Sequence, residues 1–292
     1  MNNYSIWVLE YANVPQMATG LFVYGAYNAG TRKMPYCYVV IKGHGQTTMV
    51  DVGYNHRLHG EVLATRYGVE NWQAPRVVLS ECDIAPEDVK CVFITHAHFD
   101  HMGNTDAFPN ATFYIQEREL SKWIWAMSLE RRFRWLLGGI DTSDIMRVVD
   151  LARQGRLICV NGSRENVLPG IDLCAAFDTH TWGSMYVRVR NDLKTSSADT
   201  YILAGDLVYA YENMRGHDAS DREYIPIGNA TGSQSDLIQT TEAMLAAVGH
   251  DDRRIIPVHE DRLRDVFPSR IAANGLRITE VALADGDRSR VR

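Results

Sequence analysis

The sequence predicts an α/β fold made of two mixed β-sheets with helices packed against their outer faces. Short apolar or β-branched runs, typical of buried strands, recur along the 292 residues, and helical patterns separate only some of them. Direct strand-to-strand steps favour mixed sheets over a doubly wound parallel sheet. Because no low-complexity linker, charge block or clear internal repeat interrupts the chain, we expect one domain spanning residues 1–292.

Nine segments carry the strand pattern, and four carry the spacing of apolar residues that favours a helix. The expected strands are residues 36–41, 47–53, 91–95, 111–115, 156–160, 171–177, 185–190, 200–205 and 254–258. The expected helices are residues 57–68, 117–139, 142–155 and 235–249, and in the last of these Ser235 is a suitable N-cap. Residues 11–36 are rich in Gly, Tyr and Asn and predict a long loop or a hairpin.

Charge and composition narrow the expected partners and compartment. A formal net charge of -6 gives no basic bias toward nucleic acid or an anionic membrane, so a small-molecule substrate is the expected partner. The five cysteines are odd in number and form no C-x-x-C pair, which argues against a disulfide framework and a Cys-based zinc site and fits a reducing compartment. With no signal-peptide pattern and no apolar run approaching about 18 residues, we expect a cytoplasmic protein.

Four of the expected strands are followed by a residue that can bind a metal. His96, His180, Asp206 and His259 each come directly after, or within a few residues of, an apolar run. Strand ends at one edge of a sheet are places where distant segments converge and ligands bind. Taken singly, His180 or His259 is more often an ordinary hydrogen-bonded histidine than a metal ligand.

The cluster His96-x-His98-x-Asp100-His101 strengthens the metal interpretation, because chance produces this pattern with a probability on the order of 10⁻³. One tetrahedral zinc takes three or four protein ligands, so seven candidates indicate two sites. We expect one site at His96, His98 and His180, the other at Asp100, His101 and His259, with Asp206 bridging. Imidazole and carboxylate suit Zn, Fe, Co or Mn. The other histidines are expected to be structural or exposed: His44, His56, His59, His217 and His250.

The segment Thr-His-Ala-His-Phe-Asp-His at 95–101 resembles the signature of the metallo-β-lactamase superfamily. The likeness continues through Asp51 in MVDVG, His180 in DTHTWGS, Asp206 in LAGD and His259 in PVHE. It implies an αβ/βα four-layer sandwich with two divalent metal ions, zinc first among them, at one edge of the two sheets. Asp206 resembles the bridging position of the dinuclear hydrolases and differs from true β-lactamases, where a Cys or His pattern is expected.

Within that superfamily the sequence is most similar to the N-acyl homoserine lactonases, through the complete dinuclear set and Tyr209 placed three residues after Asp206. This likeness implies a quorum-quenching hydrolase that opens the ring of a small lactone by attack of a metal-bridging hydroxide. Asp100, Asp206 and Tyr209 would be the catalytic residues, with Tyr209 contacting the substrate carbonyl. Asp100 would also carry a proton to the leaving alkoxide, and Asp51 would orient a metal histidine.

The sequence departs from the family pattern at two positions, and several alternative functions stay open. Trp182 replaces the usual proline after His180-Thr, and Glu260 follows His259 where a different ending is common. The same residues also fit ring-opening of a cyclic amide or imide, another ester or thioester hydrolase, a one-iron oxidative enzyme, or a non-catalytic binding protein. The helix carrying Trp123 and Trp125 could line the pocket, form a homo-oligomer contact or lie in the core.

Overall fold

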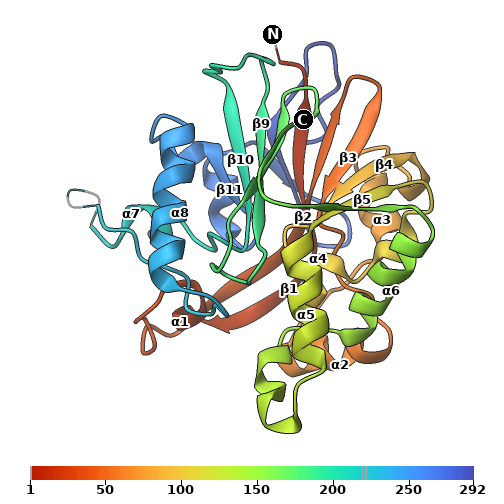
Figure 1. Ribbon diagram of the computed structural model, residues 1–292. Coiled ribbons are helices and arrows are strands. Elements are labelled where there is room, and N and C mark those ends of the chain that lie inside the picture. Colours follow the sequence, from red (N-terminus) through yellow and green to blue (C-terminus); the bar gives the residue numbers. More distant parts are fainter. Residues whose placement is uncertain (1, 219, 221) are drawn as a thin grey trace.

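The computed structural model describes residues 2–218, 220 and 222–292. It shows two β-sheets packed face to face, with α8 on one outer side and α3, α5 and α6 on the other (Figure 1). Parallel and antiparallel neighbours occur in both sheets. The predicted fold class, a four-layer sandwich of two mixed sheets flanked by helices, is confirmed.

The larger sheet has the order β12 (Ser269–Ile271), β13 (Arg277–Ala282), β1 (Ser5–Ala18), β2 (Thr31–Gly43), β3 (Gln46–Val50), β4 (Val89–Phe93), β5 (Thr112–Gln116) and β6 (Leu157–Val160). The smaller sheet has the order β11 (Ile255–Pro257), β10 (Thr200–Gly205), β9 (Met185–Arg190), β8 (Ile171–Ala175) and β7 (Arg164–Leu168). Each of the nine predicted strands has a counterpart among these.

The α-helices are α1 (Thr19–Phe22), α2 (Leu58–Tyr67), α3 (Pro75–Ser80), α4 (Phe99–Met102), α5 (Glu117–Met127), α6 (Thr142–Arg153), α7 (Glu212–Arg215) and α8 (Gln234–Ala247). Short 3₁₀ helices are η1 (Pro86–Asp88), η2 (Thr105–Ala107), η3 (Arg131–Leu137), η4 (Asp252–Arg254) and η5 (Asp261–Asp265). Among the described residues no helix has the length and apolar composition needed to span a bilayer.

The sequence did not predict strand β1, because the strand lacks the alternation of a half-exposed strand. Residues 5–12 are all buried, since the sheet is covered on both faces. One buried acid in this run, Glu10, is paired with Lys33 at 2.7 Å on the neighbouring strand. The segment 11–36 proves to be a hairpin, formed by the extended ends of β1 and β2 with α1 between them.

Two helix predictions need correction. The helix expected over 117–139 ends at Met127, where the Ser128 hydroxyl donates to the Trp125 carbonyl at 2.7 Å, and a separate 3₁₀ helix follows. The N-cap of α8 is Ser233, whose extended backbone lets its side chain accept from the Asp236 amide, whereas Ser235 lies inside the first turn. The N-cap therefore lies two residues earlier than expected.

The two sheets meet where β4 and β10 end, at Thr95. The Met185 amide of β9 donates to the Thr95 carbonyl at 3.0 Å. Gly205, at the end of β10, has a φ of +54, and a Cβ there would lie 2.9 Å from the Thr95 side chain. A glycine is required at this contact both by backbone conformation and by space. Strand ends from both sheets are thereby brought to one edge.

Asn213 fixes the segment that follows β10. Its side-chain oxygen accepts from the amides of Tyr209 and Ala210, both at 2.9 Å, and its amide group donates to the carbonyls of Phe22 and Ile225, both at 2.8 Å. The side chain is buried. This one residue therefore satisfies four backbone groups that would otherwise be unpaired.

We expect Asn213→Ala to lower the free energy of unfolding by about 3 kcal/mol, because it leaves several buried backbone groups without partners. Urea unfolding followed by circular dichroism measures this. The exposed Asn161→Ala is the matched control, with a change within about 0.5 kcal/mol. Equal losses in the two variants would contradict the role given to Asn213.

Candidate metal centre

The seven predicted ligands come from strand ends of both sheets and meet at one edge of the sandwich. His96 and His98 lie in the segment after β4, and Asp100 and His101 lie on α4, which continues that segment. His180 lies between β8 and β9, while Asp206 and His259 follow β10 and β11. The structure brings the seven into two adjacent groups, which are His96, His98, His180 and Asp206, and Asp100, His101 and His259.

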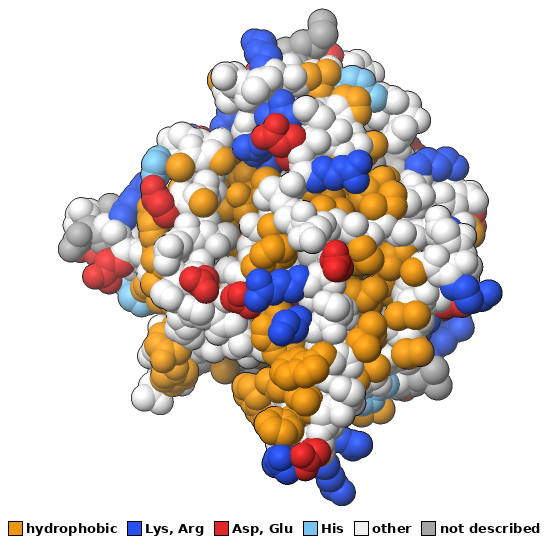
Figure 2. Space-filling model, in the orientation of Figure 1, with side chains coloured by type: hydrophobic (Ala, Val, Ile, Leu, Met, Phe, Trp, Pro, Cys, Tyr) orange, Lys and Arg blue, Asp and Glu red, His pale blue; other side chains and the backbone are white. Residues whose placement is uncertain are grey.

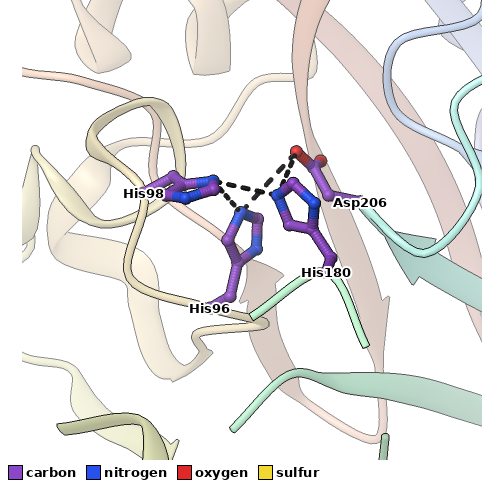
Figure 3. A group of neighbouring side chains, drawn as sticks. All are labelled: His96, His98, His180 and Asp206. Atoms are coloured by element: carbon purple, nitrogen blue, oxygen red, sulfur yellow. Dashed lines mark hydrogen bonds and ion pairs between the residues drawn. The ribbon is translucent and has the colours of Figure 1, made fainter. Parts of the chain in front are cut away.

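In the first group three imidazole nitrogens point at one another (Figure 3). The Nδ1 atom of His98 lies 3.0 Å from Nε2 of His96 and 2.9 Å from Nε2 of His180. The Oδ2 atom of Asp206 completes the group, 3.3 Å from His180 Nε2 and 3.6 Å from His96 Nε2. This is a set of three nitrogens and one oxygen, the ligand number and type of a tetrahedral zinc site.

The second group shares Asp206 through the other oxygen of the same carboxylate. Oδ1 of Asp206 lies 3.0 Å from Nε2 of His101 and 3.1 Å from Nε2 of His259. Oδ2 of Asp100 lies 3.6 Å and 3.7 Å from the same two nitrogens. Asp206 therefore faces each group with a different oxygen, which is the arrangement expected of a bridging carboxylate.

Hydrogen bonds on the outer side of the rings determine which nitrogens carry protons. Nδ1 of His180 donates to the Asn229 carbonyl at 2.9 Å, and Nδ1 of His259 donates to the Pro35 carbonyl at 2.8 Å. A carbonyl can only accept, so in the neutral rings each Nε2 presents a lone pair toward the centre. Fixing the tautomer from outside in this way is typical of metal-binding histidines.

Three buried atoms at the centre lack a hydrogen-bond partner among the described residues: Nε2 of His101, Nε2 of His259 and Oδ1 of Asp206. All three belong to the second group or to the bridge. Buried polar atoms left unpaired are costly and rare, so such a cluster requires an explanation. Two divalent cations would satisfy these atoms and the facing lone pairs of the first group, and the two groups fit a dinuclear site.

The pKa values of the clustered side chains do not all shift in the same direction, because burial and neighbouring charges act differently on each group. Burial, then the neighbouring histidines, hold the pKa values of His96 and His98 well below the ordinary value, which keeps both rings neutral and able to ligate. Burial alone would lower the pKa of His101, but the nearby carboxylates, led by Asp206, raise it above the ordinary value. Burial also raises the pKa of Asp100, the only cluster acid shifted in that direction.

Asp51 orients the cluster without belonging to either group. Its Oδ2 accepts from Nδ1 of His101 at 2.7 Å and from the Thr95 hydroxyl at 2.8 Å, while Oδ1 accepts from the Thr95 amide at 2.8 Å. Because the Thr95 hydroxyl gives its proton to Asp51, it accepts from Nδ1 of His96, which lies 3.0 Å away. The hydrogen bond expected between Asp51 and a histidine of the cluster is present, to His101 directly, and Thr95 links Asp51 to His96.

Tyr209 lies against the same centre. Its hydroxyl donates to Oδ2 of Asp206 at 2.7 Å, and its ring contacts the rings of His259 and His180 at centroid distances of 5.0 and 5.9 Å. Burial, then the negative charge of Asp206, raises the pKa of Tyr209 well above 10. The phenol therefore keeps its proton at neutral pH and can act as a hydrogen-bond donor.

The two departures noted in the sequence have structural roles outside the pocket above the cluster. Trp182 packs on Trp123 and Trp125 of α5, with centroids 4.7 and 5.8 Å apart. Trp123 is buried in the core, whereas Trp125 is half-exposed. Glu260 accepts from the Tyr211 amide and binds Arg262. None of these six residues is among those that line the pocket above the cluster.

Several residues of this region were not identified from the sequence. Glu119 of α5 is fully buried and accepts hydrogen bonds next to His96, His98 and His180. The sequence feature that could have identified Glu119 is a carboxylate on the apolar face of a helix, beside Leu120 and Trp123. The backbone carbonyl of Asn229 could not be identified from the sequence, because every residue type has a backbone carbonyl. The five remaining histidines are exposed, as predicted: His44, His56, His59, His217 and His250.

Comparison with known proteins agrees with this geometry. Residues 30–163 match the model of the metallo-beta-lactamase superfamily, a range that includes the cluster at 96–101. These residues therefore carry the sequence pattern of a metallo-beta-lactamase domain. A short segment of 41 residues is 46% identical to a probable metallo-hydrolase of Methanocaldococcus jannaschii, and it covers 14% of this chain and 20% of that protein. The match thus spans about a fifth of the length of that relative.

Solved structures resemble this chain over most of its length. One is an N-acyl homoserine lactone hydrolase with the product N-hexanoyl-L-homoserine at its catalytic metal centre, with 15% identity, a TM-score of 0.67, and 91% of this chain and 96% of that chain covered. Another is a probable metal-dependent hydrolase from Staphylococcus aureus, with 18% identity, a TM-score of 0.64 and 89% and 91% covered. At these identities the likeness shows the fold alone.

We expect Asp51→Ala to lower the free energy of unfolding of the metal-free chain by about 3 kcal/mol, because three buried donors lose a charged acceptor. Urea unfolding in the presence of a chelator measures the loss. Asp106→Ala removes a carboxylate that is 67% exposed and serves as the control, with almost no change expected. A small effect at Asp51 would mean that the Thr95 and His101 donors find other partners.

Proposed function

We propose that this chain is a hydrolase that uses two divalent metal ions, most simply zinc, to open the ring of a lactone. Membership of the superfamily supports a metal-dependent hydrolase. The observation that carries the dinuclear assignment is the shared carboxylate of Asp206, with one oxygen toward each group of histidines. A single ion held by the first group would leave the buried Nε2 atoms of His101 and His259 without a hydrogen-bond partner among the described residues.

The proposed ligands follow from the two groups. His96, His98 and His180 would hold one ion, Asp100, His101 and His259 the other, and Asp206 both. Divalent ions held there supply a hydroxide nucleophile at neutral pH and polarise a carbonyl. Ligand type leaves Fe, Co and Mn as alternatives to Zn.

Two side chains of the protein are suited to act on the reacting groups. Tyr209 would turn its hydroxyl from Asp206 to the carbonyl oxygen and stabilise the negative charge that develops there. Asp100 would take up a proton and pass it to the leaving alkoxide, a role that suits a carboxyl whose pKa is raised by burial. The backbone carbonyl of Asp100 accepts from the Tyr11 hydroxyl at 2.7 Å, which holds the residue in place.

The pocket above the cluster favours an uncharged substrate with an apolar substituent. Its walls are largely aliphatic and aromatic, including Met17, Leu21, Met34, Tyr36 and Phe99, and no Lys or Arg of the described chain lines it. A phosphodiester or another anion would find no counter-charge there apart from the metals. An N-acyl homoserine lactone, the substrate class of one structural relative, combines a neutral ring with an acyl chain. Cyclic amides and linear esters remain alternatives in the substrate screen.

We expect about two metal ions per purified chain and hydrolysis of lactones in a screen that includes lactams, imides, esters and thioesters. Asp206→Asn should retain less than the full metal complement and lose at least about 100-fold in rate, because both sites share this ligand. Metal analysis and product detection give the two readouts. Asp265→Asn, on a side chain that is 63% exposed, is the control. One iron per chain with oxygen consumption would sink the proposal.

We expect Tyr209→Phe to keep both metals and to lose turnover by about 100-fold with little change in KM, the effect of removing one donor to a developing oxyanion. Steady-state kinetics on the preferred lactone measure both constants. The control is Tyr211→Phe, since the Tyr211 hydroxyl is buried and has no hydrogen-bond partner among the described residues. An unchanged turnover in the Tyr209 variant would show that the tyrosine has been misassigned.

A further inference from the structure

We propose that Glu119 is a positioning residue that clamps together the two ligand-bearing segments of the first group, and that the second group does not depend on it. The inference rests on the proposed metal binding and goes beyond it, because it assigns a separate set of orienting hydrogen bonds to each of the two sites. Glu119 lies at the start of α5, is fully buried and does not line the substrate pocket.

Four donors converge on the Glu119 carboxylate. Oε1 accepts from the Ala97 amide at 2.8 Å and from the Trp123 indole at 2.7 Å. Oε2 accepts from the Thr181 hydroxyl at 2.7 Å and from the Gly183 amide at 2.8 Å. All four partners are N–H or O–H groups, so the ionised carboxylate is the form that they complement.

The two oxygens serve different segments of the chain. Ala97 lies between His96 and His98, after β4 of the larger sheet, whereas Thr181 directly follows His180, between two strands of the smaller sheet. One carboxylate therefore ties together the two segments that supply all three histidines of the first group. Metal histidines from two sheets need such a tie, because sub-ångström displacement of a ligand weakens a site.

The fit between α5 and the His180 segment is too close for any side chain at position 183. A Cβ on Gly183 would lie 2.2 Å from the backbone nitrogen of Glu119. The segment is also closed on itself, because the Thr181 amide donates to the Ser184 hydroxyl at 2.9 Å. Its contact with Glu119 therefore fixes it as a unit, with His180 at one end.

The second group has supports of its own. His101 is oriented by Asp51, His259 by the Pro35 carbonyl, and the backbone of Asp100 by the Tyr11 hydroxyl. None of these bonds involves Glu119. Loss of the Glu119 carboxylate should therefore weaken one site and spare the other.

The test isolates each site in turn. In a His259→Ala background zinc binding reports on the first group, and in a His98→Ala background it reports on the second. We expect Glu119→Gln to lower zinc affinity about 10- to 100-fold in the first background. The amide NH₂ of the glutamine would face two of the four donors and could not accept a hydrogen bond from them. In the second background the affinity should stay within about twofold, since the site shares no hydrogen bond with Glu119. Competition with a chromogenic chelator measures both affinities.

Glu117→Gln, an exposed glutamate of the same helix, is the matched control and should change neither affinity. Should Glu119→Gln not fold, as judged by circular dichroism, Thr181→Val removes a single donor and should show the same selectivity with a loss of about fivefold.

Equal losses in both backgrounds, or no loss in either, would overturn the selective role of Glu119 while leaving the proposed function intact. A wild-type chain that binds none of Zn, Fe, Co and Mn would overturn both proposals.

Discussion

Five imidazole nitrogens and three carboxylate oxygens converge in one largely buried space, and the surrounding structure serves to keep them there. Lone pairs that face one another at about 3 Å repel unless a positive charge lies between them. The carbonyls of Asn229 and Pro35 turn the lone pairs of His180 and His259 inward by binding the protons on the opposite side of each ring. The chain thus forms a geometry that bound cations would stabilise in the dinuclear site that we propose.

The two sheets hold this geometry through a few close contacts at their shared edge. Thr95 is central, because it contacts Gly205 of the opposite sheet, donates twice to Asp51 and accepts from His96. On the other side of the first group, Gly183 lies directly on the backbone of Glu119. Ligands therefore sit on rigid strand ends and braced loops, which is where a precise site can be built.

Local sequence patterns predicted much of this arrangement, and the rest depends on tertiary contacts. The meeting of the seven residues followed from chemical type and position after an apolar run, both of which are readable locally. Strand β1 was missed because burial on both faces removes alternation, and the end of α5 was missed because Ser128 is an acceptable helix residue. Glu119 could not be distinguished from the other acids, since its role is defined by donors 22 and 62 residues away.

The shared carboxylate of Asp206 has a thermodynamic consequence. One of its oxygens faces the first group, and the other faces the second group. In the dinuclear site that we propose, a cation bound on one side would draw electron density from the carboxylate and fix its torsion, so the affinity of the other side would change with occupancy. By reciprocity the effect has equal size in both directions. The two sites of the proposed dinuclear centre would therefore form a cooperative pair, and the order in which they fill would depend on the protein as well as on the metal.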